Sequence, residues 1–287
     1  MGVLLIVLSA LAFSLSSYFG KIVTNTTAMS GVITSFGRFF LGAISFFLYI
    51  MFKRNSFKAP DIKPIAYRAI FNSIAIILFS TAFQYTTITN ANMLHMTYPV
   101  FVILLAPFYT KETIRKNIYL YLISIMIGSY VVANPSFNSI NMGDILALLS
   151  AIIAAFSILS LTESRKENEG YIIIFYVMLM GTIVNIPFAY KDLANFDMSA
   201  LTLVFISSAL GVLGQIFITW GYKYVDSATG SLAATSRIVM SGLIGYLFLN
   251  EPLNLRIIIG MTLITLSLVG LSGYFDKKKK DLKGNKF

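Results

Sequence analysis

Long runs of apolar residues repeat along almost the whole chain, and short polar stretches separate them. A helix needs roughly 20 apolar residues to cross a bilayer core of about 30 Å. Ten runs reach or approach that length, at residues 3–23, 30–52, 64–86, 89–109, 116–133, 143–161, 171–189, 200–222, 228–248 and 256–275. The pattern therefore predicts an all-α integral membrane protein with ten transmembrane helices.

The runs fit neither the strands of a membrane barrel nor a cleavable leader. Barrel strands alternate apolar and polar residues over about ten positions, whereas these runs are longer and continuous. The first run begins at Gly2 with no basic region before it and no small-residue cleavage site. We therefore interpret it as a retained helix and not as a signal peptide.

Composition supports a membrane protein and excludes a large soluble domain. Hydrophobic residues make up 57% of the chain and charged residues 12%, whereas soluble domains carry roughly 25% charged residues. The formal net charge of +10 raises nucleic-acid binding as an alternative. The basic residues lie in short loops and a tail, however, which favours membrane topology and no nucleic-acid partner. Without cysteine, disulfide and thiol chemistry are excluded.

The distribution of basic residues predicts the orientation. Ten spans place both termini on one side, and sixteen basic residues fall on that side: Lys53, Arg54, Lys58, Lys63, Lys111, Arg115, Lys116, Arg165, Lys166, Lys223, Lys277, Lys278, Lys279, Lys280, Lys283 and Lys286. The other side holds three, Lys21, Lys191 and Arg256. Because positive residues accumulate in the cytoplasm, both termini are expected there, in the cytoplasmic membrane of a bacterial-type cell. The lysine-rich tail 276–287 fits a topology anchor, with lipid binding as an alternative.

Two halves of the chain resemble each other. A shift of 139 residues places Glu112 on Glu251 and Tyr98 on Arg237. We expect a first repeat at 1–135 and a second at 136–275, with five helices each. Since five is odd, the second repeat must be inverted in the membrane. Inverted repeats are typical of transporters, with the solute site near the midplane between the halves.

The two glutamates stand where one apolar run ends and the next begins. At such a boundary a carboxylate stays near water and favours the positive N-terminal end of the next helix. Pro252 suits a first helical turn, where no backbone donor is needed. We interpret Glu112, Glu251 and Pro252 as helix-boundary residues. A role of the glutamates in gating or proton coupling is the alternative.

The boundary motifs also resemble a known family. YLFLNEPLNLRIIIGMTLITLSLVGL (246–271) resembles the end of an EamA domain, the repeat unit of the drug/metabolite transporter superfamily. FQYTTITNANMLHMTYPVFVILLAPFYTKE (83–112) carries the same signature in the first half. The resemblance implies ten helices, an inverted repeat and a central cavity lined by helices 1–4 and 6–9. It implies transport of metabolites such as amino acids, nucleotide-linked sugars or vitamins, and names no single solute.

Deep polar residues are the candidates for solute binding. No acidic residue lies deep in a predicted span, so the chain lacks a buried carboxylate for proton-coupled drug export. Arg237 lies near the middle of its span, where arginine costs about 2.5–3.5 kcal/mol and usually faces a cavity. A structural arginine held at a helix break is the alternative. Arg38 is deep as well, although snorkelling could bring it to the interface.

His95 is the one histidine, and Pro99 follows it by four residues. Proline has no N–H, so the carbonyl of His95 loses its helical partner and the helix is expected to break. His95 shares a helix face with Tyr98. We expect His95 and Tyr98 to face Arg237 across the midplane, with a packing role for the histidine as the alternative. No second histidine or cysteine supports a metal site.

Other polar residues are weaker candidates, because polar groups in membranes often join neighbouring helices. They are Asn72, Gln84, Asn185, Gln215, Tyr18, Tyr176 and Trp220, of which Asn72 and Gln215 are placed with the substrate-binding set.

The sequence thus favours a secondary transporter of a small organic metabolite, working by alternating access without a cofactor. No phosphate-binding loop or nucleophile–base set indicates an enzyme. Unpaired deep arginines and aromatic residues favour a flat, electron-rich vitamin such as riboflavin as the solute. Export of an amino acid or another metabolite is one alternative, and a channel or a non-transporting membrane module is another. The oligomeric state is not predicted.

Overall fold

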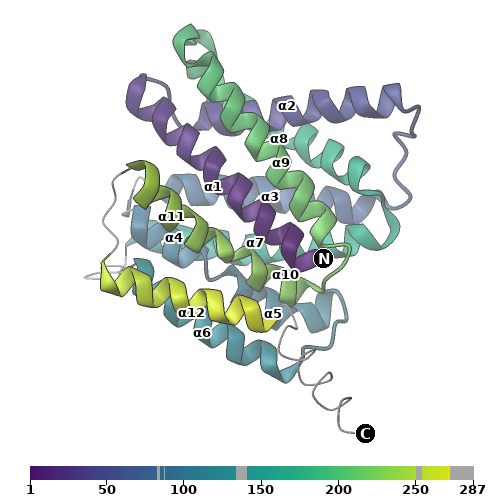
Figure 1. The fold of residues 1–287 in the computed structure, drawn as a ribbon. Helices are drawn as coiled ribbons and strands as arrows, with labels where there is room; N and C mark the ends of the chain where they lie inside the picture. Colours follow the sequence, from purple (N-terminus) through teal and green to yellow (C-terminus); the bar gives the residue numbers. More distant parts are fainter. Residues whose placement is uncertain (83–84, 87, 134–140, 250–253, 272–287) are drawn as a thin grey trace, which may run out of the picture.

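The computed structural model describes residues 1–82, 85–86, 88–133, 141–249 and 254–271, and their regular structure is helical (Figure 1). The helices are α1 (Gly2–Thr26), α2 (Val32–Phe52), α3 (Ile62–Ala82), α4 (Ile88–His95), α5 (Tyr98–Tyr109), α6 (Lys116–Ala133), α7 (Met142–Glu167), α8 (Gly170–Ala194), η1 (Met198–Ala200), α9 (Leu201–Gly221), α10 (Ser227–Ala234), α11 (Ser236–Leu249) and α12 (Leu255–Leu271).

These helices form the ten spans that the apolar pattern predicts. Helices α4 and α5 together make the fourth span, and α10 and α11 make the ninth. Within the described residues, seven helical segments are long and apolar enough to cross a membrane. The fourth, fifth and tenth spans are shorter apolar helices, Met93–Tyr109, Lys116–Val132 and Leu255–Leu271. The predicted all-α, ten-span fold is confirmed.

Short contacts show which helix ends share a face of the molecule. Gly2, at the start of α1, packs against the backbone of Gly221, at the end of α9. Asp61 before α3 and Asn168 after α7 exchange hydrogen bonds: the Asp61 N–H donates to the Asn168 Oδ1 at 3.2 Å, and Asn168 Nδ2 donates to the Asp61 carbonyl at 2.8 Å. We call this side the N-terminal face.

The other helix ends meet on the opposite face. Ser30, before α2, donates hydrogen bonds from its N–H and its hydroxyl to Asp192, at the end of α8. Thr86, beyond the end of α3, donates to Asp144 in the first turn of α7 at 2.7 Å. Helix α7 therefore starts on the opposite face, whereas α1 starts on the N-terminal face. The second half is inverted relative to the first.

Most extensive helix pairs join one half to the other. Helix α1 packs on α9, α2 on α8, α3 on α7 and α6 on α12. In the repeat, α1, α2, α3 and α6 correspond to α7, α8, α9 and α12. Exchanging corresponding helices converts the α1–α9 pair into the α7–α3 pair and leaves the α2–α8 and α6–α12 pairs unchanged, as a symmetric repeat requires. The two halves thus share one core.

Small residues allow the close approach of these pairs. A Cβ atom on Gly128 of α6 would lie 2.8 Å from the carbonyl oxygen of Gly260 of α12, and one on Gly260 would lie 2.6 Å from the Gly128 oxygen. The backbones of α6 and α12 therefore touch. Helix α7 buries a face of small residues against its neighbours: Ala147, Ser150, Ala151, Ala155, Ser157 and Ser160.

Candidate functional site

The fourth span breaks between α4 and α5, at Met96 and Thr97. The Thr97 N–H and hydroxyl both donate to the Leu94 carbonyl, at 3.1 and 2.6 Å, and the Val100 N–H donates to the Thr97 carbonyl at 2.9 Å. These bonds tighten the turn to a three-residue spacing. Pro99, the second residue of α5, supplies no donor to the turn before it. The break that Pro99 predicts is present.

The ninth span breaks with the same bonds, although it has no proline there. The Thr235 N–H and hydroxyl donate to the Leu232 carbonyl at 3.1 and 2.6 Å, and the Ile238 N–H donates to the Thr235 carbonyl at 2.9 Å. The two breaks are thus 138 residues apart. This offset pairs Arg237 with Pro99, and not with Tyr98 as the shift of 139 suggested.

Arg237 is the second residue of α11, directly after the break. Its Nη2 donates to the Ser17 hydroxyl of α1 at 2.9 Å, and its guanidinium lies 5.7 Å from the centre of the Phe13 ring. Its carbonyl accepts a hydrogen bond from Ser14 at 3.4 Å, and Ser14 also contacts Ser241 of α11 at 2.9 Å. Helix α1 therefore fixes both the backbone and the charge of Arg237.

Arg38 of α2 approaches the same aromatic ring from another helix. Its guanidinium lies 5.9 Å from the centre of Phe13 and 4.7 Å from that of Phe39. Its aliphatic stem passes over Gly211 of α9, where an added Cβ would overlap Arg38 Cδ and lie 2.8 Å from Arg38 Cγ. The Arg38 Nε is buried and has no hydrogen-bond partner among the described residues. Arg38 and Arg237 are thus brought together over Phe13.

A third arginine, Arg68 of α3, was not predicted as a site residue. It is 5% exposed, and its Nη1 donates to the Ser157 hydroxyl of α7 at 2.6 Å. Its Nε is buried and unpartnered among the described residues. Because Arg68 lies near the start of α3, the sequence alone suggested an arginine at the membrane interface. One sequence feature could have indicated a site role: Arg68 is four residues from the candidate Asn72, so both share a helix face. We name Arg38, Arg68 and Arg237 the arginine cluster.

His95 and Tyr98 flank the first break. His95 Nδ1 lies 2.8 Å from the Ser150 hydroxyl of α7, and its ring centre lies 4.5 Å from that of Phe79. Tyr98 is 8% exposed and donates to the carbonyl of Ser231 in α10 at 3.3 Å. Tyr98 therefore ties one broken span to the other. No direct contact of Arg237 with His95 or Tyr98 is found among the described residues, so their meeting across the midplane stays a prediction.

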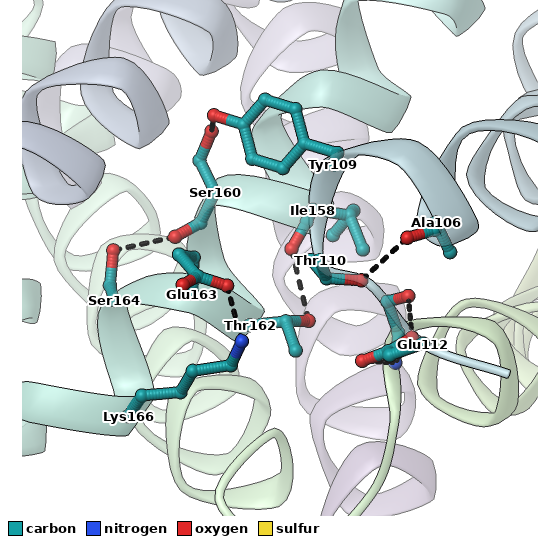
Figure 2. Close-up of polar contacts among 11 residues, drawn as sticks. Ala106, Tyr109, Thr110, Glu112, Ile158, Ser160, Thr162, Glu163, Ser164 and Lys166 are labelled. Atoms are coloured by element: carbon teal, nitrogen blue, oxygen red, sulfur yellow. Dashed lines mark hydrogen bonds and ion pairs between the residues drawn. The ribbon is translucent and has the colours of Figure 1, made fainter.

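The arginine cluster has no acidic counterpart in the part of the chain that the structure describes. Its polar contacts are serine hydroxyls, and the remaining neighbours are aromatic faces. The one ion pair between described side chains in Figure 2 joins Lys166 to Glu163, 2.6 Å apart on α7. Like charges therefore gather between the halves without compensation, which favours an electron-rich ligand.

The remaining candidates stand apart from these contacts or lie outside the described residues. Gln215 is 8% exposed and donates to Thr219 on its own helix at 3.3 Å. Asn72 is half-buried on α3. Gln84, Glu251 and Pro252 are not among the described residues.

Glu112 joins the two halves at the N-terminal face. Its two carboxylate oxygens lie 3.1 Å from the N–H of Ser227, the first residue of α10, and the Ser227 hydroxyl also donates to it. The described bonds of Glu112 thus cap α10 of the other half, and not α6, which follows Glu112 in the chain. Figure 2 shows this region beside α7, where the Tyr109 and Ser160 hydroxyls lie 2.9 Å apart.

Ten apolar spans, two inverted halves and paired helix breaks, with arginines within the spans, define the class of a secondary-transporter fold. The chain belongs to the EamA-like transporter family, whose model matches residues 1–134 and 141–273. The match covers both halves, so the family resemblance seen in the boundary motifs is confirmed. The protein is a multi-pass membrane transporter and not an enzyme.

Two characterised transporters are similar to this chain at low sequence identity, and the matches cover most of its length. The Pseudopaline exporter CntI of Pseudomonas aeruginosa is 23% identical over 94% of this chain and 95% of its own length. The S-adenosylmethionine uptake transporter of Rickettsia bellii is 22% identical over 78% of each chain. A solved crystal structure, 13% identical, matches with a TM-score of 0.74 over 96% of this chain and 98% of its own. That likeness concerns the fold alone.

Proposed function

We propose that the protein moves a small organic metabolite with a carboxylate or another anionic group across the cytoplasmic membrane. The observation that carries this proposal is the arginine cluster, which has no carboxylate partner among the described residues. An ionised ligand would supply the missing acceptor oxygens, and a planar guanidinium matches a carboxylate with two parallel bonds.

The mechanism that we propose is alternating access. The cluster takes one arginine from each of α2, α3 and α11, so it bridges both halves. Rocking of one half against the other would expose these side chains first to one face and then to the other. The N-terminal face would be cytoplasmic, because it carries most of the basic residues.

The named relatives support a metabolite as the solute and leave its identity open. One is named as an exporter and another as an uptake transporter, so the direction is not part of the proposal. Riboflavin, which the aromatic content and deep arginines favoured, has no support among these relatives. It remains a test ligand beside the amino acids.

The test is ligand binding to purified, folded protein, with a panel of amino acids, other carboxylates, S-adenosylmethionine and riboflavin. We expect a carboxylate to raise the melting temperature of the parent. Arg237→Ala should weaken its binding by about 1.5–3 kcal/mol, the usual worth of a hydrogen bond to a charged group. Arg237→Lys should lose almost as much, because an ammonium cannot make two parallel bonds.

Arg256→Ala is the matched control, since Arg256 is exposed on α12 and should leave binding unchanged. Parent-like binding by both Arg237→Ala and His95→Ala would place the site elsewhere. Binding of riboflavin without any carboxylate would restore the vitamin as the solute. Counterflow in vesicles separates a carrier from a pore, because only a carrier exchanges labelled for unlabelled solute.

A further inference from the structure

A groove of about 1020 Å³ lies beside α1, outside the arginine cluster. Helices α1, α10, α11 and α12 line it, and its walls are mainly aliphatic. Val3, Leu4 and Val7 come from α1, Val239 from α11 and Leu268 from α12. We call it the lateral groove. Four helices from both ends of the chain border it, so it is a groove between helices and not the surface of one helix.

The mouth of the lateral groove is basic. Arg115, just before α6, and Lys223, just after α9, both line it at the N-terminal face. Neither has an ion pair with a carboxylate of the described residues. Asp226 also lines the groove, but its two oxygens accept hydrogen bonds from the Thr229 N–H and hydroxyl, at 2.6 and 3.0 Å. Its charge is therefore directed at the start of α10.

An aliphatic trough with two cations at one end matches an amphiphile with an anionic head. We propose that the lateral groove binds an anionic phospholipid from the leaflet at the N-terminal face. Arg115 and Lys223 would bind the headgroup, and the aliphatic walls would hold one acyl chain. The groove volume is at the upper end for a small-molecule site, which suits a lipid better than a small metabolite. Cations beside a membrane surface attract anionic lipids in this way.

The test uses quenching of a single tryptophan by phospholipids brominated on their acyl chains. Trp220 is the one tryptophan of the chain and does not line the groove, so Trp220→Phe provides the background. Leu268→Trp places a reporter in the groove. Purified protein in mixed vesicles is titrated with brominated phosphatidylglycerol or brominated phosphatidylcholine. We expect phosphatidylglycerol to occupy the site about fivefold or more in preference, the selectivity that one near-surface cation provides.

Leu266→Trp is the matched control, because Leu266 lies on the same helix, is 59% exposed and does not line the groove. Both brominated lipids should quench the fluorescence of this tryptophan equally. Adding Arg115→Gln and Lys223→Gln should abolish the selectivity at Leu268→Trp, while Lys53→Gln with Arg54→Gln should keep it. Equal quenching of Leu268→Trp by both lipids overturns the proposal, as does selectivity that survives the loss of Arg115 and Lys223. No solute enters this experiment, so its result is independent of the proposed transport function.

Discussion

The arginine cluster brings like charges together within the membrane-spanning helices α2, α3 and α11. Two of the guanidiniums rest on one ring, Phe13, and contacts of this kind contribute about 0.5–2 kcal/mol each. Serine hydroxyls and aromatic faces hold the three side chains but do not neutralise them. A bound anion would do both.

Gly211 makes the position of Arg38 possible. In Gly211→Ala the new Cβ would overlap Arg38 Cδ and lie 3.2 Å from the Ser16 hydroxyl, so the arginine must leave Phe39. We expect weaker solute binding and, because overpacking destabilises, a loss of about 1–3 kcal/mol of stability. Melting temperature and binding are measured on the purified variant.

Gly242→Ala on α11 is the control, since its nearest neighbour is the flexible end of Met261 at 3.3 Å. Its melting temperature and binding should stay close to those of the parent. Unchanged binding in Gly211→Ala would show that Arg38 does not need this position to act on the solute.

At the scale of the elements, each half contributes one helix that is broken in the same way. A threonine is common to both breaks: the N–H and hydroxyl of Thr235 donate to the Leu232 carbonyl as those of Thr97 donate to the Leu94 carbonyl, and only the first break has a proline beside it. Glu112 fixes the start of the second broken span from the other half.

The cap at α10 can be tested through the charge of Glu112. Glu112→Ala removes the carboxylate that accepts from the first N–H of α10, beside the N-cap residue Asp226. Loss of such a capping bond costs about 0.5–2 kcal/mol. Glu112→Gln should lose less, because its amide oxygen still accepts a hydrogen bond. Thermal unfolding in detergent measures both variants.

Glu169→Gln serves as the comparison, because Glu169 precedes α8 but its side chain makes no capping hydrogen bond. It should leave the melting temperature unchanged. Equal stability of Glu112→Ala and the parent would mean that the cap does not hold α10. Folded Glu112→Gln protein that binds solute but cannot transport it would favour the gating role instead.

The sequence was enough to predict the ten spans, because the bilayer thickness fixes the length of each apolar run. It also predicted the first break, because the missing N–H of Pro99 affects only the helix that contains it. The second break has no such local marker, since threonine within a helix usually leaves it continuous. The position of Arg68 near a helix end concealed its burial against Ser157, which depends on how α3 meets α7. The partner of Glu112 was missed for the same reason, because α10 lies more than a hundred residues away in the chain.

At the scale of the whole molecule, the two faces make a topological prediction. Reporter fusions after Lys58 and after Asp197 should report opposite sides, with Lys58 in the cytoplasm, because these loops follow an even and an odd number of spans. A reversed result would overturn the orientation and leave the fold intact. The same side for both fusions would contradict the inverted repeat.

The pairing of α1 with α9, α2 with α8 and α3 with α7 also has a consequence for biosynthesis. Ribosomes deliver the first five spans to the bilayer before any of these partners exists. During that interval Arg38 lacks its packing against Gly211, and Arg68 lacks the Ser157 hydroxyl to which it later donates a hydrogen bond. The nascent first half therefore holds two arginines without these contacts, and we expect it to depend on the insertion machinery until the second half arrives. For the same reason, the two halves made as separate polypeptides should be degraded when expressed alone and should persist when expressed together.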